Sequence, residues 1–335
     1  MSPEPESSVS YEMLEDLENE FQQVELDLIR HQAKLSNDLY AKREKIVAEI
    51  ARFWPLVFEA SPPDIDEYIQ PSDAALLLGN LKSLSVERFE LQNGDPRSIA
   101  IRFEFGDNEH FEDKVLEKKF WWRHAKDGWS GLVSEPIDIK WKSEAKDLTG
   151  GMLGLARRVW QEDCAGKKEV ETEAKKQLKD KMSRTGLGGV SFFAWFGFRG
   201  RDVSAAENTK ALKAEQEKRQ ARKEGKAKDQ DENDGHDQDA HQDDEYNLEI
   251  FPTADDLAIA IAEDLWPNAI KYFTQAQEQD VASDAWFESD GGEEEQDEAN
   301  GQDEDGDEDG DGYEDEDEDE EDEADQGPPQ KKRKA

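Results

Sequence analysis

The chain has 335 residues, a formal net charge of −42 and a single cysteine, Cys164. This acidic balance argues against direct contact with nucleic acids or anionic membranes and favours basic proteins as partners. One cysteine excludes an intramolecular disulfide, the acidic N-terminus lacks the apolar core of a signal peptide, and no run of about 18 apolar residues predicts a membrane span.

Residues 1–8 are predicted to be disordered, and residues 9–54 are predicted to form one long helix. The helical segment contains no glycine, Ser8 and Ser10 can cap its N-terminus, and Pro55 cannot continue its hydrogen-bond ladder. Apolar residues recur with spacings of three and four between charged flanks, which is typical of a helix that pairs with another helix. This apolar stripe comprises Leu14, Leu17, Phe21, Val24, Leu28, Leu35, Leu39 and Ile46.

The stripe predicts that the long helix is the interface of a homodimer. The alternative is a helix that folds back onto its own domain. The chain contains no second helical segment of similar length, and a long helix with a narrow stripe needs a partner of its own kind. We therefore prefer the homodimer.

Residues 55–287 are predicted to form an α+β domain. A proline-rich connector and a short helix at residues 73–80 lead into four segments in which apolar residues alternate with polar ones. These predicted strands are centred on residues 84–89, 99–105, 120–122 and 137–141. Consecutive strands joined by short turns favour an antiparallel sheet with one face in solvent. Two helices that begin near Thr253 and Ala269 would cover the other face.

A low-complexity segment at residues 205–245 interrupts this domain. It is rich first in lysine, arginine and glutamate and then in aspartate and glutamine. Such a composition offers too little apolar surface to fold, so we predict a disordered insertion. The charged stretch at residues 143–190, which includes a second insertion at 150–185, has a helical tendency around residues 168–183.

Residues 288–326 are predicted to form a disordered acidic tail. Residues 288–325 hold 25 Asp and Glu and no Lys or Arg, and residues 1–287 still carry a net charge of −21. An extended chain of this composition has roughly one negative charge every 5 Å, near the spacing of about 3.4 Å along a nucleic-acid strand. The tail could therefore replace DNA as the ligand of a basic protein. The alternative is a segment that only keeps the protein soluble.

A short basic cluster closes the chain within residues 327–335. It consists of Lys331, Lys332, Arg333 and Lys334. Such a cluster is typical of a nuclear localisation signal that an import receptor binds. It could instead act as an intramolecular clamp on the acidic tail. We predict import, and hence a nuclear protein that could shuttle with the cytoplasm.

Six motifs occur in a characteristic order along the chain. They are RFW at 52–54, IRFEFGDNEHF at 101–111, VLEK at 115–118, IKWK at 139–142, SFFAWF at 191–196 and DLWPNAIKYF at 264–273. Together they resemble the nucleosome assembly protein (NAP)/SET family of histone chaperones. The SFFAWF segment resembles the fungal type of the SET branch of this family. The resemblance implies a dimer formed by the long helix. It also implies an α+β "earmuff" domain that binds histones and an acidic C-terminal tail.

The resemblance implies a histone chaperone that binds core histones and promotes nucleosome assembly and disassembly without ATP. Alternatives are a cofactor that presents histones to a histone acetyltransferase, a phosphatase inhibitor, and a plain acidic scaffold. The sequence shows no catalytic constellation, so we expect no enzyme activity, no cofactor and no bound metal. A calcium-loop pattern at residues 307–318 is a chance match in so acidic a tract.

Because residues 1–287 are acidic without the tail, we expect a second histone-binding surface on the domain itself. Carboxylates flank the apolar face of the helix that begins at Thr253, and these are the first candidates: Asp255, Asp256, Glu263 and Asp264. An alternative position on the sheet side would use Glu104, Asp107 and Glu112. Either group could also be an ordinary solvated face.

Overall fold

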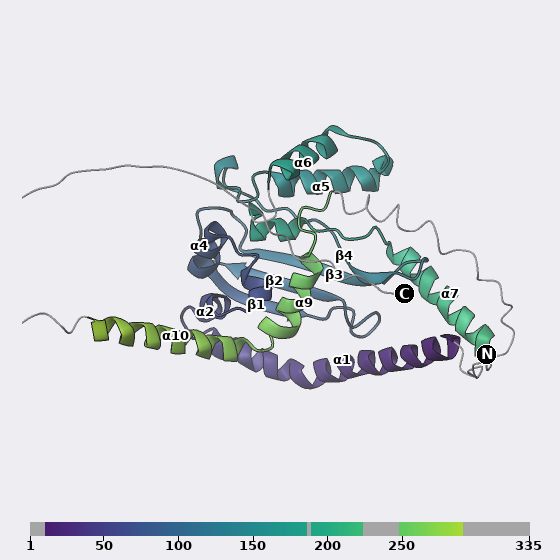
Figure 1. The fold of residues 1–335 in the computed structure, drawn as a ribbon, viewed down its shortest axis with the longest axis horizontal. Helices are drawn as coiled ribbons and strands as arrows, with labels where there is room; N and C mark the ends of the chain where they lie inside the picture. Colours follow the sequence, from purple (N-terminus) through teal and green to yellow (C-terminus); the bar gives the residue numbers. More distant parts are fainter. Residues whose placement is uncertain (1–10, 186–188, 224–247, 291–335) are drawn as a thin grey trace, which may run out of the picture. The chain divides into compact units, whose positions relative to one another are not determined.

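The computed structural model describes residues 11–185, 189–223 and 248–290 (Figure 1). The predicted disorder at residues 1–8, the later part of the insertion, the tail from residue 291 and the basic cluster lie outside these residues. In chain order the elements are α1 (Tyr11–Val47), α2 (Phe53–Glu59), α3 (Pro63–Asp66), α4 (Pro71–Asn80), β1 (Leu81–Glu87), β2 (Ile99–Phe105), β3 (Val115–His124), β4 (Ser130–Ser134), η1 (Glu144–Lys146), α5 (Met152–Glu162), η2 (Asp163–Lys167), α6 (Glu173–Arg184), η4 (Phe192–Gly197), α7 (Ala205–Lys223), α9 (Ala254–Ala260), η5 (Ile261–Leu265) and α10 (Ala269–Asp290).

The long helix ends earlier than the sequence predicted. α1 stops at Val47, and Arg52 then takes the left-handed conformation with φ 59° before α2 starts. Five of the seven residues of α2 are buried, and a straight continuation of α1 would have left them in solvent. Pro55 lies in the first turn of α2, where the missing N–H costs no helical hydrogen bond.

The four strands form one antiparallel sheet in the order β1-β2-β3-β4. Leu84, Phe103 and Leu116 are aligned across β1, β2 and β3, and all three are buried. The fourth strand was predicted in the wrong place, because β4 is Ser130–Ser134 rather than residues 137–141. The later segment is extended but lies on η4 instead of the sheet edge, and the backbone N–H of Ile137 donates to the carbonyl oxygen of Phe196 at 3.1 Å.

The core is centred on the aromatic segment η4. Its rings surround Phe103, whose ring centroid lies 5.9 Å from that of Phe192, 6.0 Å from Trp195 and 5.8 Å from Phe196. The indole N–H of Trp195 donates to the carbonyl oxygen of Ala254 at 2.8 Å. The segment therefore joins the sheet to α9, and α5 also packs against it.

Two fully buried residues of opposite charge lie beside this core. The ammonium group of Lys118 donates to the carbonyl oxygens of Glu135, Phe196 and Phe198 at 2.7, 3.0 and 2.6 Å. Glu249 accepts from the backbone N–H groups of Arg199 and Gly200 at 3.1 and 3.2 Å. Burial lowers the pKa of Lys118 to about 7 and raises the pKa of Glu249 to about 7.

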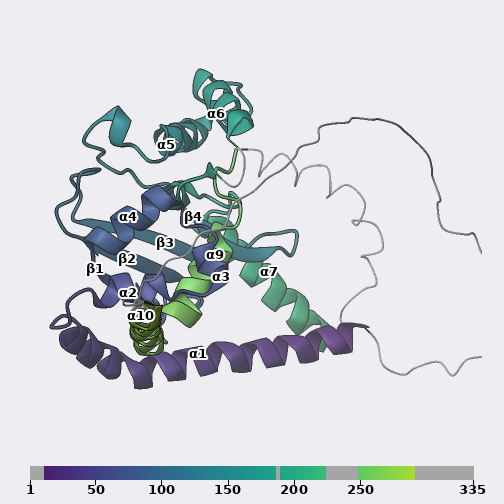
Figure 2. The same ribbon diagram turned by 60° about the vertical axis from the view of Figure 1, so that its left-hand side comes forward.

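The first half of the predicted disordered insertion is folded. Residues 205–223 form α7, which Figures 1 and 2 show running from the β3–β4 end of the sheet to the N-terminal end of α1. The prediction of disorder was wrong here because this part is rich in alanine, lysine, glutamate and arginine, which are strong helix formers. In both views α5 and α6 lie on the other side of the sheet from α1. Within the described ranges no helix is long and apolar enough to cross a membrane.

Candidate functional site

One acidic part of the domain comes from two segments that contain no Lys or Arg. These are residues 53–81 and 248–270, which are far apart in the sequence. They meet in the fold, because α3 packs against α9 and the rings of Tyr68 and Phe251 lie 5.2 Å apart. We call the exposed part of these two segments the α3–α9 surface.

The α3–α9 surface carries carboxylates on both of its helices. Asp64, Asp66 and Glu67 are exposed at α3, while Asp256 is exposed and Asp255 is half-buried in the first turn of α9. Burial, and then the negative charge of Asp256, raise the pKa of Asp255 above its ordinary value. Like charges held this close repel each other, so a cation at this surface would stabilise both carboxylates.

The other two predicted residues of α9 and η5 already have partners. Glu263 forms an ion pair with Arg88 at 3.1 Å. Asp264 accepts hydrogen bonds from the hydroxyl of Tyr272 at 2.7 Å and from the side-chain amide of Asn268 at 2.8 Å. Asp255 and Asp256 are therefore the predicted pair with more freedom to bind an external cation.

The alternative group on the sheet side is mostly neutralised by neighbours. Glu104 pairs with Arg102 at 2.7 Å, and Asp107 pairs with Lys114. A hydrogen bond from Lys114, and then its positive charge, lower the pKa of the Asp107 carboxyl. Glu112 is exposed on the loop after β2 and lies away from the α9 group in the sequence. Among the described residues, Glu104 and Asp107 are paired with basic neighbours, as Glu263 is, whereas Asp255 and Asp256 are not.

Sequence reasoning missed the contribution of α3. Residues 63–67 had been interpreted as part of a turn-rich connector because Pro62, Pro63 and Pro71 surround them. Pro63 instead occupies the first position of α3, where a proline is well tolerated. The signal that could have identified Asp64, Asp66 and Glu67 was the absence of any Lys or Arg from residue 53 to residue 81.

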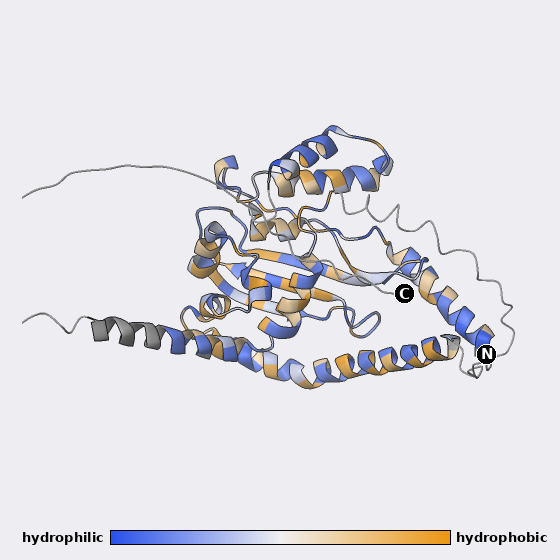
Figure 3. Cartoon of the chain, viewed as in Figure 1, coloured by the Kyte–Doolittle hydropathy of each residue, from blue (hydrophilic) through white to orange (hydrophobic). Residues whose placement is uncertain are grey.

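A second candidate surface is the apolar stripe of α1. All eight predicted interface residues are exposed in the single chain, with exposed fractions from 49 % for Leu17 to 65 % for Ile46. Figure 3 shows hydrophobic residues recurring along α1 among hydrophilic ones. A long exposed row of large apolar side chains is unusual on an isolated soluble protein and indicates a protein partner.

α1 attaches to the domain through residues that do not belong to the apolar stripe. Near its C-terminal end the rings of Tyr40 and Trp266 lie 4.1 Å apart, Arg43 donates to the carbonyl oxygen of Trp266 at 2.5 Å, and Val47 is buried. Farther along, Arg30 donates to the carbonyl oxygen of Gly94 at 3.3 Å. Each attachment leaves the apolar stripe uncovered.

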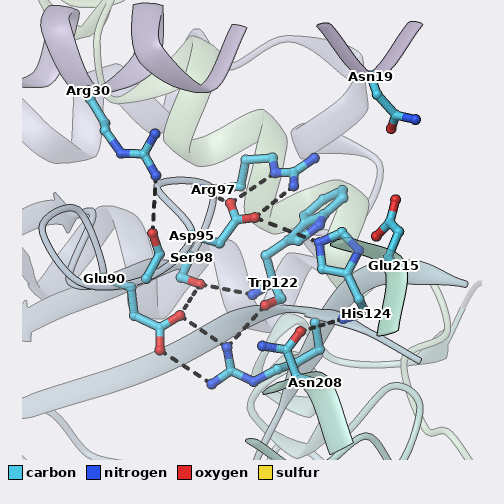
Figure 4. Close-up of polar contacts among 12 residues, drawn as sticks. Asn19, Arg30, Glu90, Asp95, Arg97, Ser98, Trp122, His124, Asn208 and Glu215 are labelled. Carbon is cyan, nitrogen blue, oxygen red and sulfur yellow. Dashed lines mark hydrogen bonds and ion pairs between the residues drawn. The ribbon is translucent and has the colours of Figure 1, made fainter. Parts of the chain in front are cut away.

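A polar cluster supports the loop that receives Arg30 (Figure 4). Asp95 accepts two hydrogen bonds from the side chain of Arg97 at 2.9 and 2.7 Å, and the guanidinium of Arg97 lies 3.9 Å from the ring centroid of Trp122. Burial alone would raise the pKa of Asp95, but hydrogen bonds with Arg97 and His124 outweigh it and lower the pKa. These contacts stabilise the loop whose Gly94 carbonyl accepts the hydrogen bond from Arg30 in the middle of α1.

Among the residues whose positions are described, no group of three or more His, Cys, Asp or Glu is arranged to hold a metal ion. His31 lies exposed on α1, His110 bonds to the carbonyl oxygen of Lys146 at 3.0 Å, and Cys164 is exposed in η2. The two surfaces built above therefore offer charge and apolar area to a partner, which is the chemistry of binding.

Comparison with known proteins gives a consistent result. Residues 47–276 match the family described as nucleosome assembly protein (NAP). A putative nucleosome assembly protein of Schizosaccharomyces pombe is 34 % identical over 148 residues, which cover 41 % of this chain and 59 % of that relative's length. Vacuolar protein sorting-associated protein 75 (Vps75) of Saccharomyces cerevisiae is 24 % identical over 301 residues, with 88 % and 89 % of the two chains covered.

Solved structures were also compared. A crystal structure of Vps75 is similar with a TM-score of 0.49 and 22 % identity, and the match covers 79 % of this chain and 96 % of that one. A crystal structure of Ccp1 is similar with a TM-score of 0.48 and 26 % identity, covering 80 % and 95 %.

Proposed function

The chain belongs to the nucleosome assembly protein (NAP) family, and on this premise we propose that it is a homodimeric histone chaperone. It binds core histones through acidic surfaces, shields them from DNA and releases them during nucleosome assembly, without ATP. The observation that carries this proposal is the α3–α9 surface, where two segments without a single Lys or Arg pack together. A surface of this kind complements a basic protein.

The homodimer would form through the apolar stripe of α1. Charge along α1 also favours one orientation of the two helices. Residues 11–27 contain seven Asp and Glu and no Lys or Arg, whereas residues 28–47 contain five Lys and Arg and two Asp and Glu. An antiparallel pair places the acidic half of each helix beside the basic half of the other, and a parallel pair would place like charges together.

The acidic tail would add a second, less specific contact with histones, and the basic cluster at residues 331–334 would direct the protein to the nucleus. Residues 291–326 and the basic cluster lie outside the described residues, and their support is the charge pattern of the sequence. The domain would then supply selectivity, and the tail would compete with nonspecific histone–DNA contacts.

The α3–α9 surface can be tested by charge reversal. Replacing Asp255 and Asp256 by Lys in the full-length protein should weaken binding of core histones at moderate salt about tenfold, since each close charge contact contributes on the order of 1 kcal/mol. The melting temperature should fall modestly, because neither residue has a salt-bridge partner among the described residues but both lie in the first turn of α9, where carboxylates favour the helix dipole. Fluorescence titration at several salt concentrations measures the affinity.

A matched control adds the same charge elsewhere. Glu144 and Glu169 are exposed and lie outside the α3–α9 surface. The Glu144→Lys, Glu169→Lys double variant should bind histones nearly as well as the wild type. If both double variants weaken binding equally, net charge rather than the α3–α9 surface determines affinity.

A further inference from the structure

α7 connects the sheet to the N-terminal half of α1. At its start, the side-chain carbonyl of Asn208 accepts from the backbone N–H of His124 in β3 at 2.8 Å, and Ala211 is buried. At its far end, the guanidinium of Arg222 lies 2.7 Å from the carboxylate of Glu15 in α1. Figures 1 and 2 agree that this end of α7 reaches the N-terminal end of α1.

The contact between α7 and α1 is polar and complementary in charge. Beside the Arg222–Glu15 pair, Arg219 donates to the side-chain carbonyl of Asn19 at 2.6 Å. α7 contains six Lys and Arg against three Glu, while residues 11–27 of α1 contain only acidic charges. Ion pairs at a partly exposed site are weak and are screened by salt, so the far end of α7 can detach without disturbing a core.

The two ends of α1 are held differently. The C-terminal end is fixed by packing, because Arg43 and Val47 are buried and Tyr40 lies against Trp266. Among the α1 residues whose burial is described, none before Arg43 is buried. The N-terminal half is therefore held to its own domain through hydrogen bonds and ion pairs, at Arg30 and at the end of α7.

We propose that α7 is a salt-sensitive strap that fixes the N-terminal half of α1 against its own domain. While the strap is closed, it sets the direction in which the apolar stripe of α1 faces. When the strap opens, α1 keeps its packed C-terminal end and its contact at Arg30, and the segment before Arg30 can change direction. The strap is a property of the single chain and does not depend on histone binding.

Amide hydrogen exchange of the full-length protein, followed by mass spectrometry, tests the strap without any ligand. Arg222→Glu should accelerate exchange in residues 215–223 and 11–27 about tenfold at low ionic strength, because the ion pair becomes a repulsion. Lys210→Glu is the matched control, since it makes the same charge change on an exposed position of the same helix. This control should leave exchange in both segments unchanged.

A charge swap completes the test. Combining Glu15→Arg with Arg222→Glu restores an ion pair of opposite polarity and should return exchange in both segments to within about twofold of the wild type. High salt should accelerate exchange in the wild type and have little effect on Arg222→Glu. Equal exchange in Arg222→Glu and Lys210→Glu, or no recovery in the swap, would overturn the strap.

Discussion

At the scale of single residues, Lys118 and Glu249 place two opposite charges in the core. The ammonium group of Lys118 donates to three backbone carbonyls, whereas only one carboxylate oxygen of Glu249 accepts backbone hydrogen bonds and the other has no partner among the described residues. Their pKa values move in opposite directions from the ordinary values of 10.5 and 4.5, both to about 7. The two groups therefore affect stability in different pH ranges.

The free energy of unfolding should depend on Glu249 between pH 4.5 and 7. In this range the folded protein keeps a proton that the unfolded carboxylate has lost, so stability falls as pH rises. Glu249→Gln removes the titration and keeps an oxygen that accepts from Arg199 and Gly200. Its stability should fall less than that of the wild type from pH 5 to pH 7.5, by on the order of 2 kcal/mol.

Urea denaturation at a series of pH values measures this difference. Lys118 contributes little below pH 7, because a lysine with a lowered pKa changes stability between pH 7 and 10.5, where stability rises with pH. Asp256→Asn, at an exposed carboxylate, serves as the control. Parallel pH profiles for the wild type and Glu249→Gln would show that the buried carboxylate does not titrate in this range.

Residue-level inference from the sequence had a clear limit at the acidic surface. The pattern around Thr253 located Asp255 and Asp256 on α9, because capping residues and helical periodicity are local properties. The ion pair between Glu263 and Arg88 joins residues 175 positions apart, and no local pattern contains it. Which carboxylates have partners is decided by tertiary contacts.

At the scale of elements, α1 should be the determinant of dimerisation. Leu28→Glu combined with Leu35→Glu places two charges in the middle of the apolar stripe, and an unpaired charge buried in an interface costs several kcal/mol. The double variant should be a monomer at micromolar concentration while the wild type is a dimer. Size-exclusion chromatography with light scattering measures both masses.

The matched control for this prediction is Val170→Glu. Val170 is 53 % exposed, comparable to the stripe residues, but it lies between η2 and α6. The control should remain a dimer. A monomeric wild type at micromolar concentration would instead refute the stripe as a self-association surface.

Element prediction from the sequence succeeded where the pattern was local. The alternation of Ile99, Ile101 and Phe103 identified β2, and the α+β class followed from it. The prediction failed at the end of α1, because the chain turns before Phe53 so that α2 can pack into the core, and this is a tertiary contact rather than a local pattern. It also failed at α7, where the polar composition predicts disorder although alanine, lysine, glutamate and arginine, the commonest residues there, favour a helix.

At the scale of the whole molecule, the densest run of negative charge follows the folded domain in sequence. Residues 288–325 carry 25 acidic residues, so they should dominate long-range attraction of histones. Deleting residues 291–326 should lower histone affinity and reduce the slope of log affinity against log salt, with the melting temperature of the domain unchanged.

A tail of the same length rich in serine and glycine separates charge from chain length. It should behave like the deletion, because the attraction depends on charge density. If the neutral tail restores the salt slope of the wild type, the acidic residues are not what binds histones. Titration at four or more salt concentrations is needed to define the slope.

The turn between α1 and α2 has a mechanical consequence. α1 has 37 residues and is therefore a lever of about 55 Å that is packed at its C-terminal end and held by polar contacts at Arg30 and Glu15. A rotation of one degree at the packed end moves the other end by about 1 Å. Once the contact between α7 and α1 is open, a rotation of a few degrees at the packed end of α1 thus produces a displacement as large as a side chain at Tyr11. In a dimer joined along two such helices, a rotation of a few degrees at this end would change the distance between the two domains by several ångströms.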